Sequence, residues 1–377
     1  MHVDKPAHGG SCVGRLDGQV VFCRHSLPGE TVAAEITEDS GRFLRADAVS
    51  VLEANPHRQT SPCAWFGPAM CGGCSWLHAT PAEQVRLKSQ VLSETLERLG
   101  GVAGEVPVVS LGLESGWRTR MTLHADAAGR LGFHAARSDH IVPVGDCLQA
   151  ADDLDLAELL ARQWPAGADV HVSASTAGRA VITRRPDGSR DLDGPDEHLF
   201  DVHGRLFACA VDGFWQSHRL APEVLVDEVR GLVDGAGSIV DLYAGVGLFG
   251  LSLLTADVAR LVLVEGDRRA AAYARQNAAG DDRVRVIARD VRQWRATPAD
   301  LVVLDPPRAG AGKGVVSAVA GSGAGTIVYV SCEPSTLARD LALFAAHGYR
   351  PDHLRGFDLF PGTAHVETVV RLRRQAG

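Results

Sequence analysis

The segment SIVDLYAGVGLFGLSLL, Ser238 to Leu254, decides the fold of the C-terminal part of this chain. Its opening run, SIVDL, is predicted to be a buried strand because apolar residues dominate it. Gly245, Gly247 and Gly250 follow, and we expect them to form a turn and to open a helix. Glycine lets the backbone approach a ligand, and the N–H groups that open a helix can face that ligand. The segment therefore predicts a strand, a ligand-binding turn and a helix.

Acidic residues end the strands that are predicted next. LVLVE ends in Glu265, VRVIARD ends in Asp290, and LVVLDPPR carries Asp305 before two prolines. An acid such as Glu265 accepts hydrogen bonds from a ribose diol, and Asp290 is placed to meet the adenine end of a nucleoside. The two prolines predict a rigid, extended bend at the carboxyl edge of the sheet, where ligands bind in this architecture. We therefore expect these strand ends to form one nucleoside site.

The order of these motifs separates two classes of nucleotide-binding protein. The glycine spacing GVGLFG alone also fits a dinucleotide fingerprint. The order of glycine turn, Glu265, Asp290 and DPP at successive strand ends instead resembles the S-adenosylmethionine-dependent methyltransferases of the Rossmann-like class. Strands alternate with helices from about residue 211 onward, which is the mark of a parallel sheet with helical crossovers.

A cysteine stands where the next predicted strand gives way to a helix. In YVSCEPSTLARD, Tyr329 to Asp340, an apolar run stops at Cys332 and Pro334 opens a helix. The N–H groups and the dipole at a helix N-terminus favour a thiolate there. Cys332 is therefore a candidate nucleophile, and the alternative is an ordinary buried packing residue.

A cysteine and an acid at this edge suit one kind of methyl transfer. Carbon 5 of a pyrimidine is a poor nucleophile, but a thiolate that adds at carbon 6 makes it able to accept a methyl group. A base must then remove the carbon 5 proton so that the thiolate can leave. FDLFPGTAHVETVVRL offers Glu367 at the start of a final strand, close to His365. Because this chemistry explains its position, we predict that Cys332 is a nucleophile.

Four of the eight cysteines suggest a metal centre. Cys63, Cys71 and Cys74 lie together in CAWFGPAMCGGC, and Cys147 follows in PVGDCLQA. Four soft thiolates suit either zinc or an iron–sulfur cluster. Because there is no second CxxC and the fourth cysteine stands far along the chain, the pattern favours a cluster.

We expect three regions and an α/β fold class. Residues 1–58 contain short β-like runs separated by turn signals and predict a small β-barrel of the OB type. Residues 59–210 carry the cysteines, a capped helix over residues 80–100 and a mainly β part, and this helix is a candidate to pack on the last region. Residues 211–377 form the region of alternating strands and helices.

Composition limits the class of protein. With 377 residues, 45% of them hydrophobic and 22% charged, the chain is an ordinary globular protein that is too long for one core. The net charge of −8 argues against a general nucleic-acid coat protein but allows a local basic groove. No apolar stretch approaches the ~20 residues of a membrane span, and the N-terminus has no apolar signal region. We expect a cytoplasmic monomer without membrane contact.

Several segments resemble the RNA uracil-C5 methyltransferase family: DLYAGVGLFG, LDPPRAG, YVSCEPSTLARDL and FPGTAHVETVV. GGSCVGRLDGQVVFCRHSLPGETV is similar to the TRAM domain of that family. The cysteine quartet matches the ligands of its 23S ribosomal RNA branch, which carries a [4Fe–4S] centre. The resemblance covers nearly the whole chain. It implies a Rossmann-like class I methyltransferase domain, preceded by a TRAM β-barrel and a small central domain that carries the cluster.

The resemblance also implies roles for individual residues. Cys332 is implied as the nucleophile and Glu367 as the base that removes the proton. S-adenosylmethionine and the cluster are the implied cofactors, and RNA is the implied partner, with ribosomal RNA favoured over tRNA. Together with the glycine turn, the residues expected at the S-adenosylmethionine site are Gln216, Tyr243, Gly245, Gly247, Glu265, Asp290 and Asp305.

A tRNA rather than a ribosomal RNA substrate stays open as an alternative. Two hypotheses from other functional classes also stay open. One is an RNA nitrogen-methyltransferase in which Cys332 is structural. The other is an RNA-binding or redox-sensing iron–sulfur protein with a vestigial methyltransferase fold. In the favoured hypothesis the uridine must leave its stack to reach Cys332, and we expect Phe214 or Trp215 to hold it.

Overall fold

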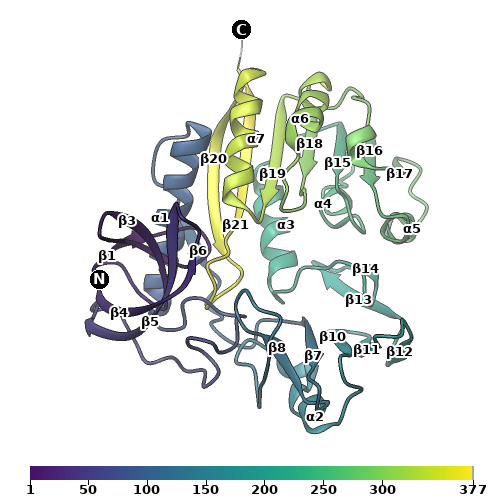
Figure 1. The fold of residues 1–377 in the computed structure, drawn as a ribbon. Coiled ribbons are helices and arrows are strands. Elements are labelled where there is room, and N and C mark those ends of the chain that lie inside the picture. The colour runs from purple at the N-terminus through teal and green to yellow at the C-terminus, as the bar shows by residue number, and fades with distance from the viewer. Residues whose placement is uncertain (376–377) are drawn as a thin grey trace.

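The computed structural model describes residues 1–375, which fold into three modules that lie side by side in Figure 1. They are an N-terminal module of strands, a central module that consists mainly of strands, and a C-terminal module in which helices flank a large sheet. Within residues 1–375, no helix is long and apolar enough to cross a membrane.

The N-terminal module is a sheet of five strands in the order β1-β2-β3-β5-β4. A bridge between His2 and Thr31 joins the two edge strands, so the sheet closes into a small barrel. Val3, Val21 and Val32 are fully buried in its interior. The strands are β1 Val3–Pro6, β2 Cys12–Leu16, β3 Gln19–Arg24, β4 Thr31–Asp39 and β5 Phe43–Glu53.

The central module contains an antiparallel sheet in the order β12-β11-β10-β7-β8-β9 and a separate hairpin of β13 and β14. Its core is a cluster around Leu123, Val170 and Leu159. The elements are β7 Arg120–Ala125, β8 Leu131–His134, β9 Ile141–Pro143, η1 Asp152–Leu154, α2 Leu156–Ala161, β10 Asp169–Ser175, β11 Gly178–Arg184, β12 Arg190–Asp193, β13 Glu197–Val202 and β14 Arg205–Ala210.

The C-terminal module is built on an eight-stranded sheet in the order β17-β16-β15-β18-β19-β21-β20-β6. The strands from β17 to β19 are parallel, and β21 runs antiparallel to β19. The elements are β6 Val108–Ser110, α3 Ala221–Gly231, β15 Ser238–Leu242, α4 Leu248–Ser252, β16 Arg260–Glu265, α5 Arg268–Asn277, β17 Val284–Ala288, η2 Val291–Gln293, β18 Leu301–Leu304, α6 Gly312–Gly321, β19 Thr326–Ser331, α7 Pro334–Ala346, β20 Tyr349–Asp358 and β21 Glu367–Arg374.

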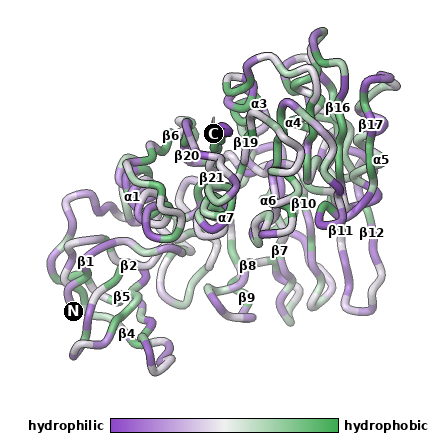
Figure 2. The backbone as a smooth tube through the Cα atoms, turned by 90° about the horizontal axis from the view of Figure 1, so that it is seen from above, coloured by the Kyte–Doolittle hydropathy of each residue, from purple (hydrophilic) through white to green (hydrophobic). Residues whose placement is uncertain are grey.

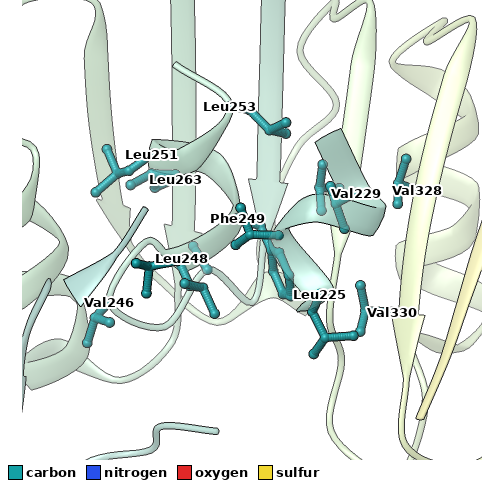
Figure 3. Packing of buried hydrophobic residues seen from close by; sticks show 14 of the residues in the cluster. Leu225, Val229, Val246, Leu248, Phe249, Leu251, Leu253, Leu263, Val328 and Val330 are labelled. Carbon is teal, nitrogen blue, oxygen red and sulfur yellow. The ribbon is translucent and has the colours of Figure 1, made fainter. Parts of the chain in front are cut away.

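Apolar clusters cover both faces of this sheet, which explains why its central strands are continuously hydrophobic. Every residue of β18 and β19 is buried. Figure 2 shows strand β16 of the same sheet mainly in green, whereas the edge strand β12 of the central sheet is mainly purple. On one face, Leu225 of α3 lies beside Val330 of β19, as Figure 3 shows.

Helix α1, Pro81–Gly100, packs on the C-terminal module and lies next to α7 (Figure 1). Gly100 permits this contact, because a Cβ atom there would lie 3.0 Å from the carbonyl oxygen of Ala338. Strand β6 follows and pairs with β20. The sequence analysis placed residues 81–110 in the region of the cysteines and named the helix over residues 80–100 as a candidate to pack on the last region. The structure shows this packing of α1 on α7, and β6 joins the C-terminal sheet as well.

A buried ion pair fixes α1 to the loop after β20. The ammonium group of Lys88 donates to a carboxylate oxygen of Asp358 at 2.5 Å and to the carbonyl oxygen of Phe360 at 3.0 Å. The side chains of Lys88 and Asp358 are 0% and 4% exposed. A charge that is buried to this degree requires its partner.

Replacement of Lys88 by Ala is expected to destabilise the fold by about 3–5 kcal/mol, because it leaves the Asp358 carboxylate buried without its partner. Urea unfolding measures this loss. Arg130→Ala, which removes an exposed partner of Asp126, is the control and should have little effect. A Lys88→Ala variant as stable as the parent would contradict this role of the pair.

Candidate functional site

Asp305, Cys332 and Glu367 meet at one edge of the C-terminal sheet. Strands β18, β19 and β21 are neighbours, and Asp305 and Cys332 directly follow the ends of β18 and β19. Strand β21 is antiparallel to β19, with Ser331 opposite Thr368, so its first residue, Glu367, lies at the same edge. The sheet therefore brings together three chemically active groups that are distant in sequence.

These residues line a cavity of about 800 Å³ at the carboxyl edge of the sheet, where β15, β16, β18 and β19 end. The strand order reverses between β15 and β18, and such a switch point is the usual ligand site of an open α/β sheet. Most of the site residues predicted from the sequence line this cavity, namely Gln216, Tyr243, Gly245, Glu265, Asp305, Cys332 and Glu367.

The predicted glycine turn lies at one wall of the cavity. Tyr243, Gly245 and Gly247 all have positive φ angles, of 62°, 56° and 96°, and glycine adopts this conformation without strain. The N–H of Gly245 donates to the Glu265 carboxylate at 2.7 Å, and the N–H of Asp267 donates to its other oxygen at 2.7 Å. The turn and the acid are thus held together before any ligand binds.

Two predicted residues do not line the cavity. Gly247 precedes α4, and a Cβ atom there would lie 2.7 Å from the side chain of Leu251, so this glycine serves close packing. Asp290 precedes η2 and is ion-paired with Arg292 at 2.6 Å. The side-chain hydrogen bond from Arg292 lowers the pKa of Asp290. Asp290 is therefore held toward its own neighbour in sequence, which the strand-end pattern did not reveal.

Burial governs the protonation of the three active groups. It raises the pKa of the Cys332 thiol to about 11, and the negative charges of Glu367 and Asp305 act in the same direction, whereas Arg308 opposes them. Burial also raises the pKa of Asp305 to about 7 and that of Glu367 well above its usual range. In the free site, the thiol therefore carries its proton at neutral pH.

A hydrogen-bond network positions the loop that carries the two prolines. The Asp340 carboxylate accepts from the Tyr329 hydroxyl at 2.7 Å and from the N–H of Ala311 at 2.7 Å. The hydroxyl of Thr336 donates to the carbonyl oxygen of Arg308 at 3.1 Å. The network fixes this loop to α7, so that Asp305 and Arg308 keep their places beside Cys332. Asp340 ends the quoted stretch YVSCEPSTLARD, but the sequence analysis gave it no role, because its partners Tyr329 and Ala311 are brought to it only by the fold.

Of the two aromatic candidates, only one is available to a ligand. Phe214 lines the cavity and is 73% exposed. Trp215 is 4% exposed and stacks on Phe200 with ring centroids 4.3 Å apart, so it belongs to the core. The prediction of Trp215 as a base-holding residue is therefore wrong, because its indole is already packed.

Arg118 is a cavity residue that sequence reasoning did not assign. Its backbone is bridged to both Ala150 and His218, and its Nε donates to the carbonyl oxygen of Arg120 at 3.0 Å. Burial lowers the pKa of its guanidinium, while Cys147, Cys74 and Cys71 oppose this shift. Arg118 belongs to the short basic stretch WRTR, Trp117 to Arg120, and no local signal indicates which of these residues faces the cavity.

The four predicted metal ligands lie near one another. Burial raises the pKa of the Cys74 thiol to about 12, and Cys147, Cys71 and Cys63 contribute in the same direction. The N–H of Gly73 donates to the Cys71 sulfur at 3.5 Å, and the Gln149 amide donates to the Cys74 sulfur at 3.7 Å. These thiols are free, which suits a thiolate-ligated group chemically. However, no set of three or more His, Cys, Asp or Glu side chains in residues 1–375 has the arrangement of a metal site.

Comparisons with known families match most of the chain. A TRAM domain model matches residues 2–49, a Methyltransferase small domain model matches residues 220–322, and a tRNA (Uracil-5-)-methyltransferase model matches residues 289–375. An uncharacterized RNA methyltransferase of Streptomyces coelicolor is 40% identical over 100% of this chain and 93% of its own. One from Corynebacterium efficiens is 35% identical over 100% and 94%.

A solved structure has a similar fold. The tRNA (uracil-54, C5)-methyltransferase of Pyrococcus abyssi, in complex with S-adenosyl-L-homocysteine, is similar over 99% of both chains with a TM-score of 0.75. The sequence identity is 22%, so this likeness concerns the fold. It supports the predicted architecture of a Rossmann-like methyltransferase preceded by strand modules.

Two substitutions beside Cys332 are expected to shift its pKa in opposite directions. Asp305→Asn should lower the pKa of the thiol below about 11, because Asp305 is ionised in the range where the thiol titrates. Arg308→Gln should raise it, because a positive charge is lost. The pH dependence of iodoacetamide alkylation at Cys332, followed by peptide mass spectrometry, measures both shifts. If neither substitution moves the titration, the charges do not act on this sulfur.

Proposed function

Because this chain belongs to the RNA uracil-C5 methyltransferase family, we propose that it methylates carbon 5 of a uridine in RNA through a covalent bond to Cys332. The observation that carries this proposal is the meeting of Cys332, Glu367 and Asp305 in one cavity. An enzyme that methylates a nitrogen needs no nucleophile beside the base, whereas carbon 5 requires both a nucleophile and a base.

In this mechanism Cys332 and Glu367 act in succession. S-adenosylmethionine, when bound, supplies the methyl group and a positively charged sulfonium. Cys332 loses its proton to water, and its sulfur adds to carbon 6, so that carbon 5 gains the electron density with which it takes the methyl group. Glu367 then removes the carbon 5 proton, the electrons of that bond reform the ring double bond, and the Cys332 thiolate leaves.

Contacts to S-adenosylmethionine are assigned to residues around the glycine turn. Glu265 is proposed to hold the ribose, and Gln216, Tyr243 and Asp305 the remainder of the molecule, with Gly245 allowing its close approach. Asp290 is proposed at the adenine end, outside the cavity lining. Phe214 is proposed to stack on the flipped uridine, because its exposed ring borders the cavity that holds Cys332.

Trapping with RNA that contains 5-fluorouridine tests the covalent mechanism. The parent protein with S-adenosylmethionine should form a stable protein–RNA adduct, because fluorine cannot be removed as a proton. Cys332→Ala should form none, and Glu367→Gln should accumulate a methylated adduct even with ordinary uridine. Cys209→Ala is the matched control, because this cysteine also lines the cavity. It should behave as the parent.

The same experiment also tests the two remaining alternatives, which are a tRNA substrate and methylation of a nitrogen. We propose ribosomal RNA rather than tRNA, in keeping with the resemblance of the cysteine quartet, and both 23S ribosomal RNA and tRNA transcripts should be offered. Adducts on tRNA alone would contradict the ribosomal target. Full methylation by Cys332→Ala would instead favour a nitrogen-methyltransferase with a structural cysteine.

We propose that the cysteine quartet Cys63, Cys71, Cys74 and Cys147 holds a [4Fe–4S] cluster that braces the central module, since no step of methyl transfer requires an electron. Protein purified without oxygen should contain about four iron and four sulfide per chain, the content of such a cluster. Cys74→Ser should lower that content, whereas Cys12→Ser, at a buried cysteine of the N-terminal barrel, should not. One zinc ion and no sulfide would overturn the assignment.

A further inference from the structure

The segment of residues 211–216 joins strand β14 to helix α3 and forms part of the cavity wall (Figure 1). It belongs to no helix or strand, so regular backbone pairing does not fix it. It nevertheless carries two residues of the proposed site, Phe214 and Gln216. The contacts that hold this irregular segment therefore decide where the Phe214 ring lies.

One side chain of the central module, Arg120 of β7, holds the backbone of this segment at three points. Its Nη2 donates to the carbonyl oxygens of Gly213 at 2.5 Å and Val211 at 3.4 Å, and its Nη1 donates to that of Trp215 at 3.3 Å. The three carbonyls belong to alternate residues, and two of them flank Phe214 in the chain. The planar guanidinium, with its fork of donors, can reach all three at once, whereas a lysine ammonium is a single point.

The guanidinium of Arg120 in turn depends on these carbonyls. Burial lowers its pKa, while Cys209 and Asp212 oppose this shift. A charged group that is partly removed from water is costly unless its N–H groups have partners. The three carbonyl oxygens supply these partners, so Arg120 and segment 211–216 stabilise each other.

Asp212 secures the same segment through its side chain. Its carboxylate is 15% exposed and pairs with Arg269 of α5 at 2.6 Å, Arg184 of β11 at 3.1 Å and Arg190 of β12 at 3.3 Å. Arg269 belongs to the C-terminal module, whereas Arg184 and Arg190 belong to the central module. Asp212 therefore fixes the segment to both modules.

Phe214 lies between anchored neighbours but is itself free of the core. Trp215 stacks on Phe200 of the β13–β14 hairpin and is 4% exposed, whereas Phe214 is 73% exposed. Because so exposed a ring has few packing contacts, its position follows from the backbone that carries it. A backbone that is fixed before a ligand binds avoids the entropy cost of ordering it at that moment.

We propose that Arg120 is a positioning residue for the uridine: by holding the carbonyls on both sides of Phe214, it keeps that ring ready to stack on the flipped base. This inference rests on the proposed function for the role of Phe214, and on the hydrogen bonds for the role of Arg120. Gln216 is held separately, because the N–H and the hydroxyl of Thr119 donate to the carbonyl oxygen of Ser217 at 2.9 Å and 3.1 Å. The effect of Arg120 therefore falls on RNA and spares S-adenosylmethionine.

Limited proteolysis with chymotrypsin, without RNA or S-adenosylmethionine, measures the anchoring alone. Chymotrypsin cleaves after aromatic residues, and cleavage after Phe214 requires the segment to leave its place. Arg120→Lys keeps the positive charge but loses the planar fork of donors. Cleavage after Phe214, identified by mass spectrometry, should therefore become about tenfold faster, because it follows the population of the opened segment.

Arg179→Lys is the matched control for this substitution. Arg179 of β11 also donates to backbone carbonyl oxygens, those of Leu154 and Asp155, but it does not line the cavity. This variant should be cleaved after Phe214 at the rate of the parent. Urea unfolding compares the global stability of the two variants.

Steady-state methylation of RNA measures the consequence for function. Arg120→Lys should lower kcat/KM for RNA about tenfold, while the Kd of S-adenosylmethionine from calorimetry stays unchanged. In a Phe214→Leu background the same substitution should have little further effect, because residues that act through one another are not additive. Since lysine retains the charge, a weaker electrostatic attraction of RNA would not explain the loss.

Equal cleavage of the parent and Arg120→Lys after Phe214 would overturn the inference. So would an equal loss of kcat/KM with and without Phe214, or a loss confined to the affinity for S-adenosylmethionine. If Arg120→Lys does not fold, Asp212→Asn leaves Arg120 in place and should give the same faster cleavage. An Asp212→Asn variant that is cleaved as slowly as the parent would then contradict the anchoring.

This inference and the proposed function fail in different ways. If cleavage after Phe214 changes as expected but no RNA is methylated, the anchoring by Arg120 stands and the proposed function falls. If RNA is methylated and the substitutions of Arg120 and Phe214 are additive, the proposed function stands and the positioning role falls.

Discussion

The gathering of Cys332, Asp305 and Glu367 in one cavity at the edge of the sheet is the constraint on which the remaining site chemistry depends. Burial raises the pKa of all three, and the negative charges of the acids further oppose ionisation of the thiol. Strand order imposes this proximity, since β18, β19 and β21 are adjacent and β21 is reversed. A positively charged ligand therefore reduces the electrostatic repulsion between the ionised forms of these three groups. This favours a cationic methyl donor over a neutral one.

Elements outside the parallel sheet keep this arrangement in place. The Asp340 carboxylate holds the loop after Asp305 from one side, through Tyr329 and Ala311. From the other side, Lys88 of α1 holds the carbonyl of Phe360, whose ring lines the cavity. Helix α1 precedes the central module in sequence, yet it supports the catalytic edge and also lines the cavity beside the N-terminal barrel.

The sequence predicted those parts of the site that local patterns encode. Strand-end motifs located Glu265, Asp305 and Cys332 correctly at one cavity, because parallel strands end at a common edge. The sequence could not show that Arg98 and Arg137 line one cavity, because that cavity forms only where three modules meet. Asp290 lies outside the cavity lining, and its local partner Arg292, two residues on, holds its carboxylate by a hydrogen bond that the strand-end pattern did not indicate.

The proposed reaction changes the charge of the ligand, and Glu367 responds to that change. While a sulfonium is present, its positive charge favours the ionised carboxylate. Methyl transfer leaves a neutral thioether, so the buried Glu367 carboxylate returns to an environment that raises its pKa well above the usual range. It therefore becomes a stronger base at the step in which the carbon 5 proton must leave. The same surroundings make the Cys332 thiolate a reluctant leaving group, since its pKa is about 11. In the proposed reaction, release of the product then depends on proton removal by Glu367, which couples the proposed roles of the two residues.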